Sequence, residues 1–229
     1  MTEVLDRFRG GLIVSCQALD DEPLHSSFIM SRMALAAQQG GAIGIRANSP
    51  ADIAAIRETV NLPIIGILKR VYPGSDVFIT ATRAELNELL AVGPDMIATD
   101  ATTRPRPNGT LADWVGAARA RSPWTPLMAD VDTVDAAEQA AALGFDTIST
   151  TLYGYTQESK GAQFAADDLQ FLRDVIRAVG PVPVIAEGNV GTPELARRAL
   201  DVGAHAVVVG GAITRPQQIT QRFTAAISA

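Results

Sequence analysis

The chain has 229 residues, of which 47% are hydrophobic and 19% are charged, and this composition excludes a disordered protein. Its net charge of −6 and its aromatic content of 5% argue against a nucleic-acid partner. The single cysteine, Cys16, cannot form an internal disulfide, and no apolar run reaches membrane-spanning length. Since the first ten residues do not resemble a signal peptide, we expect a cytoplasmic protein with no membrane partner.

Eight short runs rich in Val and Ile alternate along the chain with amphipathic helical patterns. The runs are nearly continuous in apolar residues rather than alternating, which is typical of parallel strands buried on both faces. In chain order they cover residues 11–18, 42–47, 63–69, 96–101, 127–131, 147–152, 182–187 and 206–213.

Start and stop signals frame the helices between these runs. Ser49 and Thr192 each precede a proline, which predicts a cap residue followed by a first-turn proline. Thr82 and Glu85 have the spacing of a capping box. Glycines that can adopt a left-handed helix end follow five of the patterns: Gly40, Gly93, Gly144, Gly180 and Gly203.

Eight strand–helix units in a chain of this length predict an α/β fold, a single-domain (β/α)8 barrel over residues 1–229. Residues 1–9 are expected to form a short helix that closes the bottom of the barrel. In such barrels the chemistry occurs at the carboxyl ends of the strands. The polar residues at the ends of the runs are therefore the candidates for function.

Polar residues end or follow the first seven runs: Gln17, Arg46, Lys69, Asp100, Asp130, Thr151 with Tyr153 just beyond, and Glu187. Burying so many unpaired charges would be costly, so we expect them to meet at one rim. The alternative is a structural network of strand ends that neutralise one another.

Lys69 is the sharpest candidate, because the chain has only one other lysine, Lys160, among 19 basic residues. At the barrel mouth, burial and Arg46 would lower its pKa. A neutral amine can remove a proton beside a carbonyl or attack the carbonyl to form a Schiff base. The alternative is a lysine paired with Asp100 or Glu187. Glu187 is a second acid/base, a ligand of a substrate hydroxyl, or a partner of Lys69.

Small-residue turns follow the last two runs and predict a phosphate site. Gly188-Asn189 and Gly210-Gly211 each precede a helical pattern, and Arg215 lies nearby. Exposed backbone N–H groups at a helix start bind anions, and barrel phosphate sites recur at this place. The alternative is that these glycines only form tight turns.

The remaining polar residues are predicted to have structural or surface places. With only His25 and His205 and one cysteine, we expect no metal site. Asp132 is predicted to start a helix. Arg104 and Arg106 are expected in a solvated loop, with a lid or subunit contact as the lesser alternative.

The segments GGLIVSCQAL, GGAIGIRAN, PIIGILKR, ATDATTRPRPNG, LMADVDT, STTLYGYT and IAEGNVGTPELARRALDVGAHAVVVGGAITRP together resemble the N-acylglucosamine-6-phosphate 2-epimerase family. The family is also called N-acetylmannosamine-6-phosphate 2-epimerase, and the resemblance runs from about residue 10 to residue 215. It implies interconversion of N-acetylmannosamine 6-phosphate and N-acetylglucosamine 6-phosphate by proton removal and return at C2. It also implies a role in sialic acid catabolism and no cofactor.

The resemblance assigns roles to the same residues. Lys69 and Glu187 match the family's catalytic lysine and glutamate. Gln17, Arg46 and Asp130 match its sugar-binding residues. Asp100, Thr151 and Tyr153 are added as sugar-binding candidates because they also lie at the predicted rim. The phosphate-binding elements match Gly188, Asn189, Gly210, Gly211 and Arg215.

Two other functions stay open at the level of the sequence. One is a Schiff-base aldolase or lyase that uses Lys69 on a phosphosugar, and the other is a non-catalytic phosphosugar-binding barrel. In each case the partner is a small phosphosugar, and a homodimer is an open alternative to a monomer.

Overall fold

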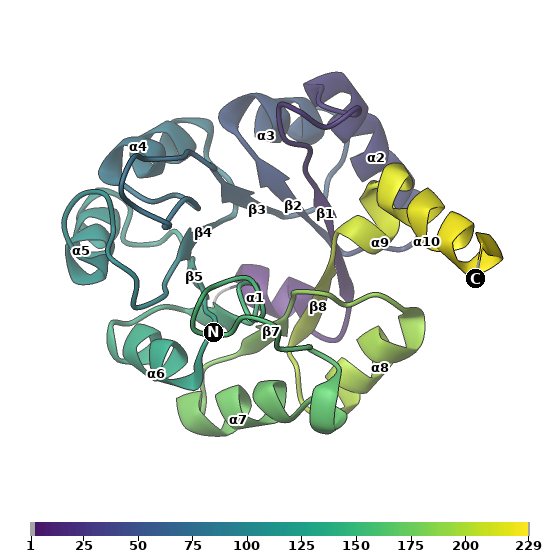
Figure 1. The fold of residues 1–229 in the computed structure, drawn as a ribbon. Coiled ribbons are helices and arrows are strands. Elements are labelled where there is room, and N and C mark those ends of the chain that lie inside the picture. The colour runs from purple at the N-terminus through teal and green to yellow at the C-terminus, as the bar shows by residue number, and fades with distance from the viewer. Residues whose placement is uncertain (1–2, 229) are drawn as a thin grey trace.

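The computed structural model describes residues 3–228 as a closed barrel of eight parallel strands in sequence order, with β8 paired to β1 (Figure 1). The strands are β1 (Leu12–Cys16), β2 (Gly44–Asn48), β3 (Ile64–Ile67), β4 (Met96–Asp100), β5 (Leu127–Asp130), β6 (Thr147–Ser149), β7 (Val184–Ala186) and β8 (Ala206–Val209). The predicted (β/α)8 barrel is thereby confirmed.

Helices surround the barrel in the alternating order that the sequence predicts (Figure 1). They are α1 (Glu3–Phe8), α2 (Ser27–Gln39), α3 (Pro50–Arg57), α4 (Arg83–Val92), α5 (Leu111–Arg121), α6 (Val134–Ala142), the 3-10 turn η1 (Ala166–Asp168), α7 (Gln170–Val179), α8 (Pro193–Asp201), α9 (Gly211–Thr214) and α10 (Pro216–Ser228). None of the helices within residues 3–228 is long and apolar enough to cross a membrane.

Each strand buries both of its faces, which explains the continuous apolar runs. One set of alternate residues fills the barrel interior, among them Ile65, Ile67, Met96, Ala98, Met128 and Ile185. The other set packs against the helices, among them Ile45, Ile64, Ile97 and Ile148. The strands are shorter than the runs because apolar residues such as Val182 and Ile213 continue into loops or into the next helix.

Helix α1 lies under the barrel, at the amino ends of the strands. Phe8 is fully buried among the interior side chains, and a Cβ on Gly44 would come within 2.4 Å of its ring. The His205 ring nitrogen Nε2 lies 2.6 Å from the Leu5 carbonyl oxygen, and the Gly10 N–H donates to the His205 carbonyl. With this end covered, the polar strand ends lie at the opposite mouth.

Most of the predicted caps fit the structure, but Gly40 and Gly180 are not left-handed helix ends, since Gly180 has a φ of 59° and a ψ of −113°. Ser49 and Thr192 cap α3 and α8, and Thr82 with Glu85 forms the capping box of α4. Gly40 was expected to be left-handed, but its φ is −77°; the next residue, Gly41, has the positive φ of 92°. The chain therefore leaves α2 one residue later than predicted, at Gly41, which can adopt a positive φ because it has no Cβ.

Candidate active site at the barrel mouth

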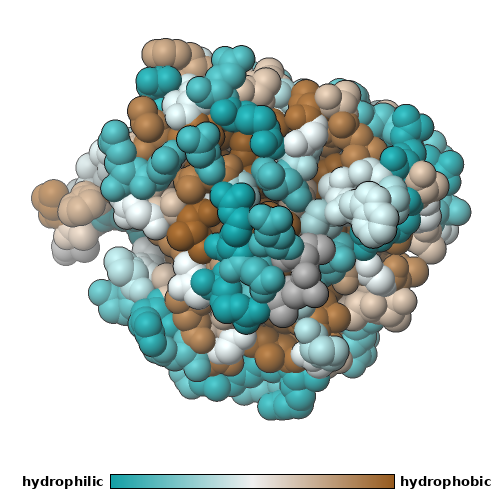
Figure 2. Space-filling view, turned by 180° about the vertical axis from the view of Figure 1, so that it is seen from behind, coloured by the Kyte–Doolittle hydropathy of each residue, from teal (hydrophilic) through white to brown (hydrophobic). Residues whose placement is uncertain are grey.

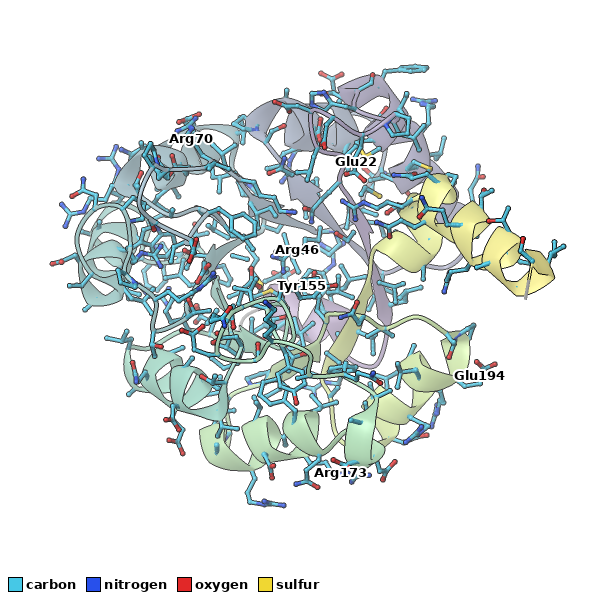
Figure 3. The ribbon with its side chains drawn as sticks, viewed as in Figure 1. Glu22, Arg46, Arg70, Tyr155, Arg173 and Glu194 are labelled. Carbon is cyan, nitrogen blue, oxygen red and sulfur yellow. The ribbon has the colours of Figure 1, made fainter. Side chains whose placement is uncertain are left out.

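Arg46 on β2 is the centre of a buried ion cluster at the mouth. Its guanidinium is 1% exposed and makes a bidentate pair with Asp130 of β5, at 2.5 and 3.0 Å. The same group donates to Glu187, just after β7, at 2.6 Å. Figure 3 shows Arg46 near the centre of the ring, far from peripheral residues such as Arg173 and Glu194. Three strands distant in sequence thus combine their charges at one point, as predicted.

Threonines at the end of β6 hold the carboxylates of this cluster in place. The Thr151 hydroxyl lies 2.7 Å from Asp130 Oδ1 and 3.1 Å from Glu187 Oε2. Thr150 fixes the Glu187 backbone, since its hydroxyl donates to the Glu187 carbonyl at 2.7 Å and accepts the Glu187 N–H at 3.0 Å. Both carboxylates therefore have fixed positions before any ligand binds.

Lys69 lies just beyond β3, and the Asn48 side chain accepts its backbone N–H at 2.9 Å. Burial, together with Arg46 and Arg215, lowers the pKa of its amine to about 8. The predicted alternative, an ion pair with Asp100 or Glu187, is not what the structure has: these carboxylates pair with Arg104 and Arg46. With this pKa a fraction of the amine is neutral near physiological pH and can act as a base.

Glu187 is a second group that can change its charge. Burial raises its pKa above the usual range for glutamate, and the negative charge of Asp130 adds to this effect, while Arg46 opposes it. A carboxyl group in this position can accept, donate or share a proton.

Several buried polar atoms within residues 3–228 have no hydrogen-bond partner, and two of them belong to side chains that the sequence predicts to bind the sugar. These two atoms are Gln17 Oε1, beyond β1, and Arg46 Nε. The other end of the Gln17 amide donates to Ser15 Oγ at 2.7 Å, so the side chain is held with its oxygen unused. Because unpaired buried polar atoms are costly, both are suited to a ligand that supplies the missing groups.

Asp100 is the neighbour of Asp130 in the sheet register, yet its carboxylate belongs to a different network. It binds Arg104 at 2.6 Å and the Thr102 hydroxyl at 2.7 Å, both from its own loop. Arg106 donates to the backbone carbonyl oxygens of Asp100, Thr80 and Ala81. The prediction of a solvated loop for Arg104 and Arg106 is wrong, because the buried Asp100 carboxylate and these carbonyls need donors.

Asp132 also differs from its prediction. The cap of α6 is Thr133, whereas Asp132 is buried and accepts a hydrogen bond from the Thr156 hydroxyl at 2.6 Å. This bond ties the end of β5 to the long loop after β6.

The structure does not bring Tyr153 to the ion cluster. Its ring stacks on Phe171 of α7, with centroids 3.7 Å apart. Tyr155, which the sequence analysis did not select, lies near the centre of the ring in the view of Figure 3. Its hydroxyl donates to Asn189 Oδ1 at 2.8 Å, so it bridges the loops after β6 and β7. The only signal in the sequence was a second tyrosine in the same YGY segment.

The two predicted glycine turns lie at the ends of β7 and β8. Gly188 and Asn189 both have positive φ, 96° and 56°. Gly210 follows β8, and Gly211 begins α9, whose first N–H groups have no partner within the helix. Arg215 follows α9 and forms a bidentate pair with Glu22, at 2.5 and 2.9 Å. Glu22, in the loop after β1, was missed by the sequence analysis.

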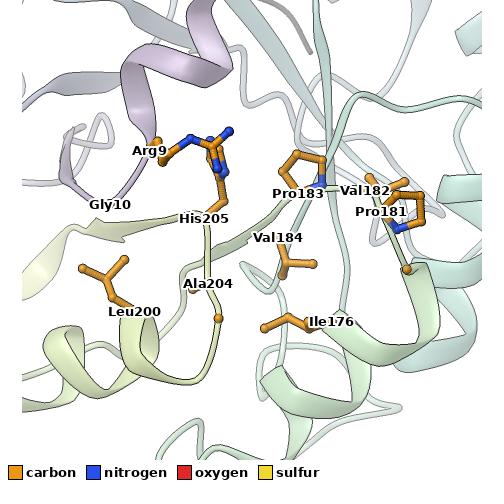
Figure 4. A pocket seen from close by; sticks show the side chains of 12 residues that line it. Arg9, Gly10, Ile176, Pro181, Val182, Pro183, Val184, Leu200, Ala204 and His205 are labelled. Atoms are coloured by element: carbon orange, nitrogen blue, oxygen red, sulfur yellow. The ribbon is translucent and has the colours of Figure 1, made fainter.

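A separate cavity lies at the opposite, amino end of the barrel (Figure 4). It has a volume of about 340 Å³ and lies between α7, α8 and the segment after α1, with Arg9 and His205 on one side and Pro181, Pro183 and Leu200 among its apolar walls. None of the mouth residues described above lines it. No three His, Cys, Asp or Glu side chains in the described part of the chain are placed to hold a metal ion.

The comparisons with known proteins agree with this geometry. A family profile described as "Putative N-acetylmannosamine-6-phosphate epimerase" matches residues 30–229. A relative from Enterobacter sp. (strain 638) is 65% identical over 230 residues, which are 100% of this chain and 97% of the relative. Another from Shouchella clausii (strain KSM-K16) is 58% identical over 227 residues, 99% of this chain and 100% of the relative. Both relatives carry the same description, for a 2-epimerase.

Solved structures give the same result. The N-acetylmannosamine-6-phosphate 2-epimerase from Clostridium perfringens superposes with a TM-score of 0.92 at 52% identity, covering 97% of this chain and 96% of that chain. Thiamine phosphate pyrophosphorylase from Pyrococcus furiosus, at 17% identity and a TM-score of 0.62, shares the fold alone. The chain belongs to the N-acetylmannosamine-6-phosphate 2-epimerase family.

Proposed function

We propose that the protein interconverts N-acetylmannosamine 6-phosphate and N-acetylglucosamine 6-phosphate. The observation that carries the proposal is an amine with a lowered pKa, Lys69, beside the buried Arg46–Asp130–Glu187 cluster at the mouth. Family membership adds the substrate class to this geometry.

The chemistry proceeds at C2 of the open-chain sugar, which is acidic because it lies beside the C1 aldehyde. Neutral Lys69 takes the C2 proton, and the electrons of the C–H bond form an enolate whose negative charge is on the C1 oxygen. Arg46 stabilises this oxygen. A proton is then returned to the opposite face of C2. Glu187 either supplies that proton or acts through a sugar hydroxyl.

Polar side chains at the mouth bind the sugar. The free Gln17 Oε1 accepts an N–H or O–H of the substrate, and Asp130 and Thr151 bind sugar hydroxyls. We assign Asp100 and Tyr153 to the walls of the mouth rather than to substrate contact, because their partners Arg104 and Phe171 lie outside the Arg46 cluster.

The phosphate binds between the two glycine turns, on backbone N–H groups of Gly188, Asn189, Gly210 and Gly211, with Arg215 as its charged partner. Binding energy far from C2 positions the reacting carbon. Because a phosphorylated sugar does not cross membranes unaided, this substrate implies action in the cytoplasm.

We also propose that the protein is a homodimer. Helix α10 projects from the barrel (Figure 1), and the space-filling view from behind shows hydrophobic residues on the projecting end (Figure 2). None of its described residues is buried, and Phe223 and Ile227 are 68% and 83% exposed. A second copy of the chain would cover this stripe.

The deciding experiment is proton NMR of N-acetylmannosamine 6-phosphate with the protein in deuterated water. Deuterium uptake at C2 with formation of the other epimer is expected. Borohydride trapping of a sugar adduct on Lys69 would instead favour a Schiff-base aldolase or lyase. Binding without exchange or conversion would favour a non-catalytic phosphosugar-binding barrel.

A further inference from the structure

We propose that Glu22 is a positioning residue for phosphate recognition, which holds Arg215 with its free amino group directed at the Gly210 turn. The inference rests on the proposed function, because it concerns how the phosphate of that substrate is held. Glu22 lies in the loop between β1 and α2, and Arg215 lies between α9 and α10.

The Glu22 carboxylate is fixed from several sides. Arg215 donates through Nε and NH2 at 2.5 and 2.9 Å, and Gln217 Nε2 donates at 3.0 Å. The backbone N–H of Leu19 donates to the same carboxylate at 2.8 Å. Four donors on two oxygens leave this side chain little freedom, and its pKa is lowered, first by the hydrogen bond from Arg215.

This pairing occupies only one edge of the Arg215 guanidinium. The remaining amino group, NH1, lies 4.0 Å from the point where a Cβ on Gly210 would stand. Arg215 therefore presents NH1 at the turn whose backbone N–H groups are proposed to receive the phosphate. An arginine fixed in this way loses little side-chain entropy when the anion binds.

Contacts next to this ion pair join the end of β1 to the segment after β8. The Thr214 hydroxyl donates to the Ser15 carbonyl at 2.8 Å, and a Cβ on Gly210 would meet the Ser15 side chain at 3.4 Å. The ion pair of Glu22 with Arg215 is a second link between these two segments. Without it, the loop after β1 and the segment after β8 would lose their charged link.

Glu22 also balances charge near the reacting amine. The charged groups that face Lys69 are Arg46 from β2, Asp130 from β5, Glu187 from β7, Arg215 after α9 and Glu22 after β1. Arg215 lowers the pKa of Lys69, and Glu22 neutralises part of that effect. Removing the charge of Glu22 therefore lowers the pKa of Lys69 further.

The test compares Glu22→Gln, Glu22→Asp and the control Asp201→Asn, which removes a carboxylate paired with Arg197 at 2.5 Å on the exposed surface of α8. For Glu22→Gln we expect KM for the phosphosugar to rise about tenfold, the size of one charge-assisted contact. KM for the unphosphorylated sugar stays unchanged. Asp201→Asn changes neither value.

The pH profile separates positioning from a general loss of structure. Glu22→Gln moves the acid limb of the rate profile to lower pH, whereas Glu22→Asp, which keeps the charge, leaves that limb in place while still raising KM. In an Arg215→Ala background, Glu22→Gln adds no further increase in KM, because its effect passes through Arg215.

Calorimetric titration with N-acetylglucosamine 6-phosphate and with N-acetylglucosamine keeps the inference testable even if turnover is absent. A tenfold weaker binding of the phosphosugar alone by Glu22→Gln supports the positioning role. Tighter binding would show that Glu22 competes with the phosphate, and equal weakening of both sugars would show a structural role; either result overturns the inference. Failure of the proposed function would appear separately, as unmodified protein that binds without converting the sugar.

Discussion

At the residue scale, the mouth is built from charges that are stable only as a group. Arg46 is buried and its charge is balanced by Asp130 and Glu187, with Thr151 adding hydrogen bonds. Removing Arg46 from such a cluster leaves uncompensated buried carboxylates, at a cost of about 3–5 kcal/mol. Lys69 is different, because Arg46 takes both carboxylates as its ion-pair partners, and the Lys69 amine has the lowered pKa. Asp130 and Thr151 therefore hold the site together, Lys69 is its proposed base, and Glu187 belongs to both groups.

Replacement of Lys69 by alanine tests the proposed base. Lys69→Ala should reduce turnover about 10²–10⁴-fold, the contribution of one positioned acid/base group. Steady-state kinetics with a thermal melt would measure it. Lys160→Ala is the matched control, since the other lysine of the chain is exposed, in the loop after β6. Near-normal turnover of Lys69→Ala would refute the assignment, and loss of folding would point to a structural role.

The dependence of rate on pH follows from the same amine. Its pKa lies near 8 rather than at the ordinary 10.5. Because the neutral form removes the proton, kcat/KM should rise with pH through about 8 and then level off. A rate that falls over this range, or that is flat from pH 6 to 9, would contradict Lys69 as the base.

At the scale of elements, the loops at the carboxyl ends of the strands set the shape of the site. The loop after β4 is fastened by Arg104 and Arg106, and the loop after β6 reaches Asn189 through Tyr155. The turn after β7 is sterically restricted. A Cβ on Gly188 would stand 3.1 Å from the Thr150 carbonyl oxygen, at a φ of 96°.

Gly188→Ala should therefore lower both stability and activity. The positive φ alone costs about 1–2 kcal/mol in a residue with a Cβ, and the crowding at Thr150 shifts the strand that carries Glu187. Gly74→Ala is the control, because Gly74 has a φ of 78° but nothing within 4 Å of the added atom. Denaturant unfolding and kinetics on both variants measure the difference. If Gly74→Ala lost as much activity as Gly188→Ala, backbone strain alone would explain the effect.

At the scale of the whole molecule, the barrel has one closed end and one polar end. Helix α1 fills the amino end with Phe8, and the polar residues of β2, β5 and β7 meet at the other end. Helix α10 stands apart from this arrangement, because its apolar residues Phe223 and Ile227 face outward.

The proposed homodimer can be tested on α10. Phe223→Asp with Ile227→Asp should convert the dimer to a monomer, because burying two carboxylates in an apolar interface is costly. Sedimentation equilibrium measures the mass. Gln221→Asp is the control, since it adds charge to the same exposed helix at a polar position. An unmodified protein that sediments as a monomer would refute the proposal.

Much of the site could be predicted because its signals are local. Arg46, Lys69, Asp130 and Glu187 end apolar runs, and the register of a closed parallel barrel brings such ends together. All four side chains belong to the alternate residues that face the barrel interior. The hydropathy of the runs does not show this alternation, because both faces of each strand are apolar. Arg106 was misplaced for the opposite reason. Its partners are backbone carbonyls at Thr80 and Ala81, which no pattern in the chain connects to it.

The eight strand–helix units, the barrel and most of the charged rim follow from local patterns, because hydrophobic period, caps and glycines act over a few residues. The pairing of the charges follows only from the folded barrel. In it Glu187 pairs with Arg46 rather than with Lys69, and Glu22 pairs with Arg215, which lies 193 positions away in the chain. The folded barrel also bonds Tyr155 to Asn189 of the loop after β7, and stacks Tyr153 on Phe171 of α7. Pairing depends on distances between loops from different strands, and those distances are set only when the barrel closes.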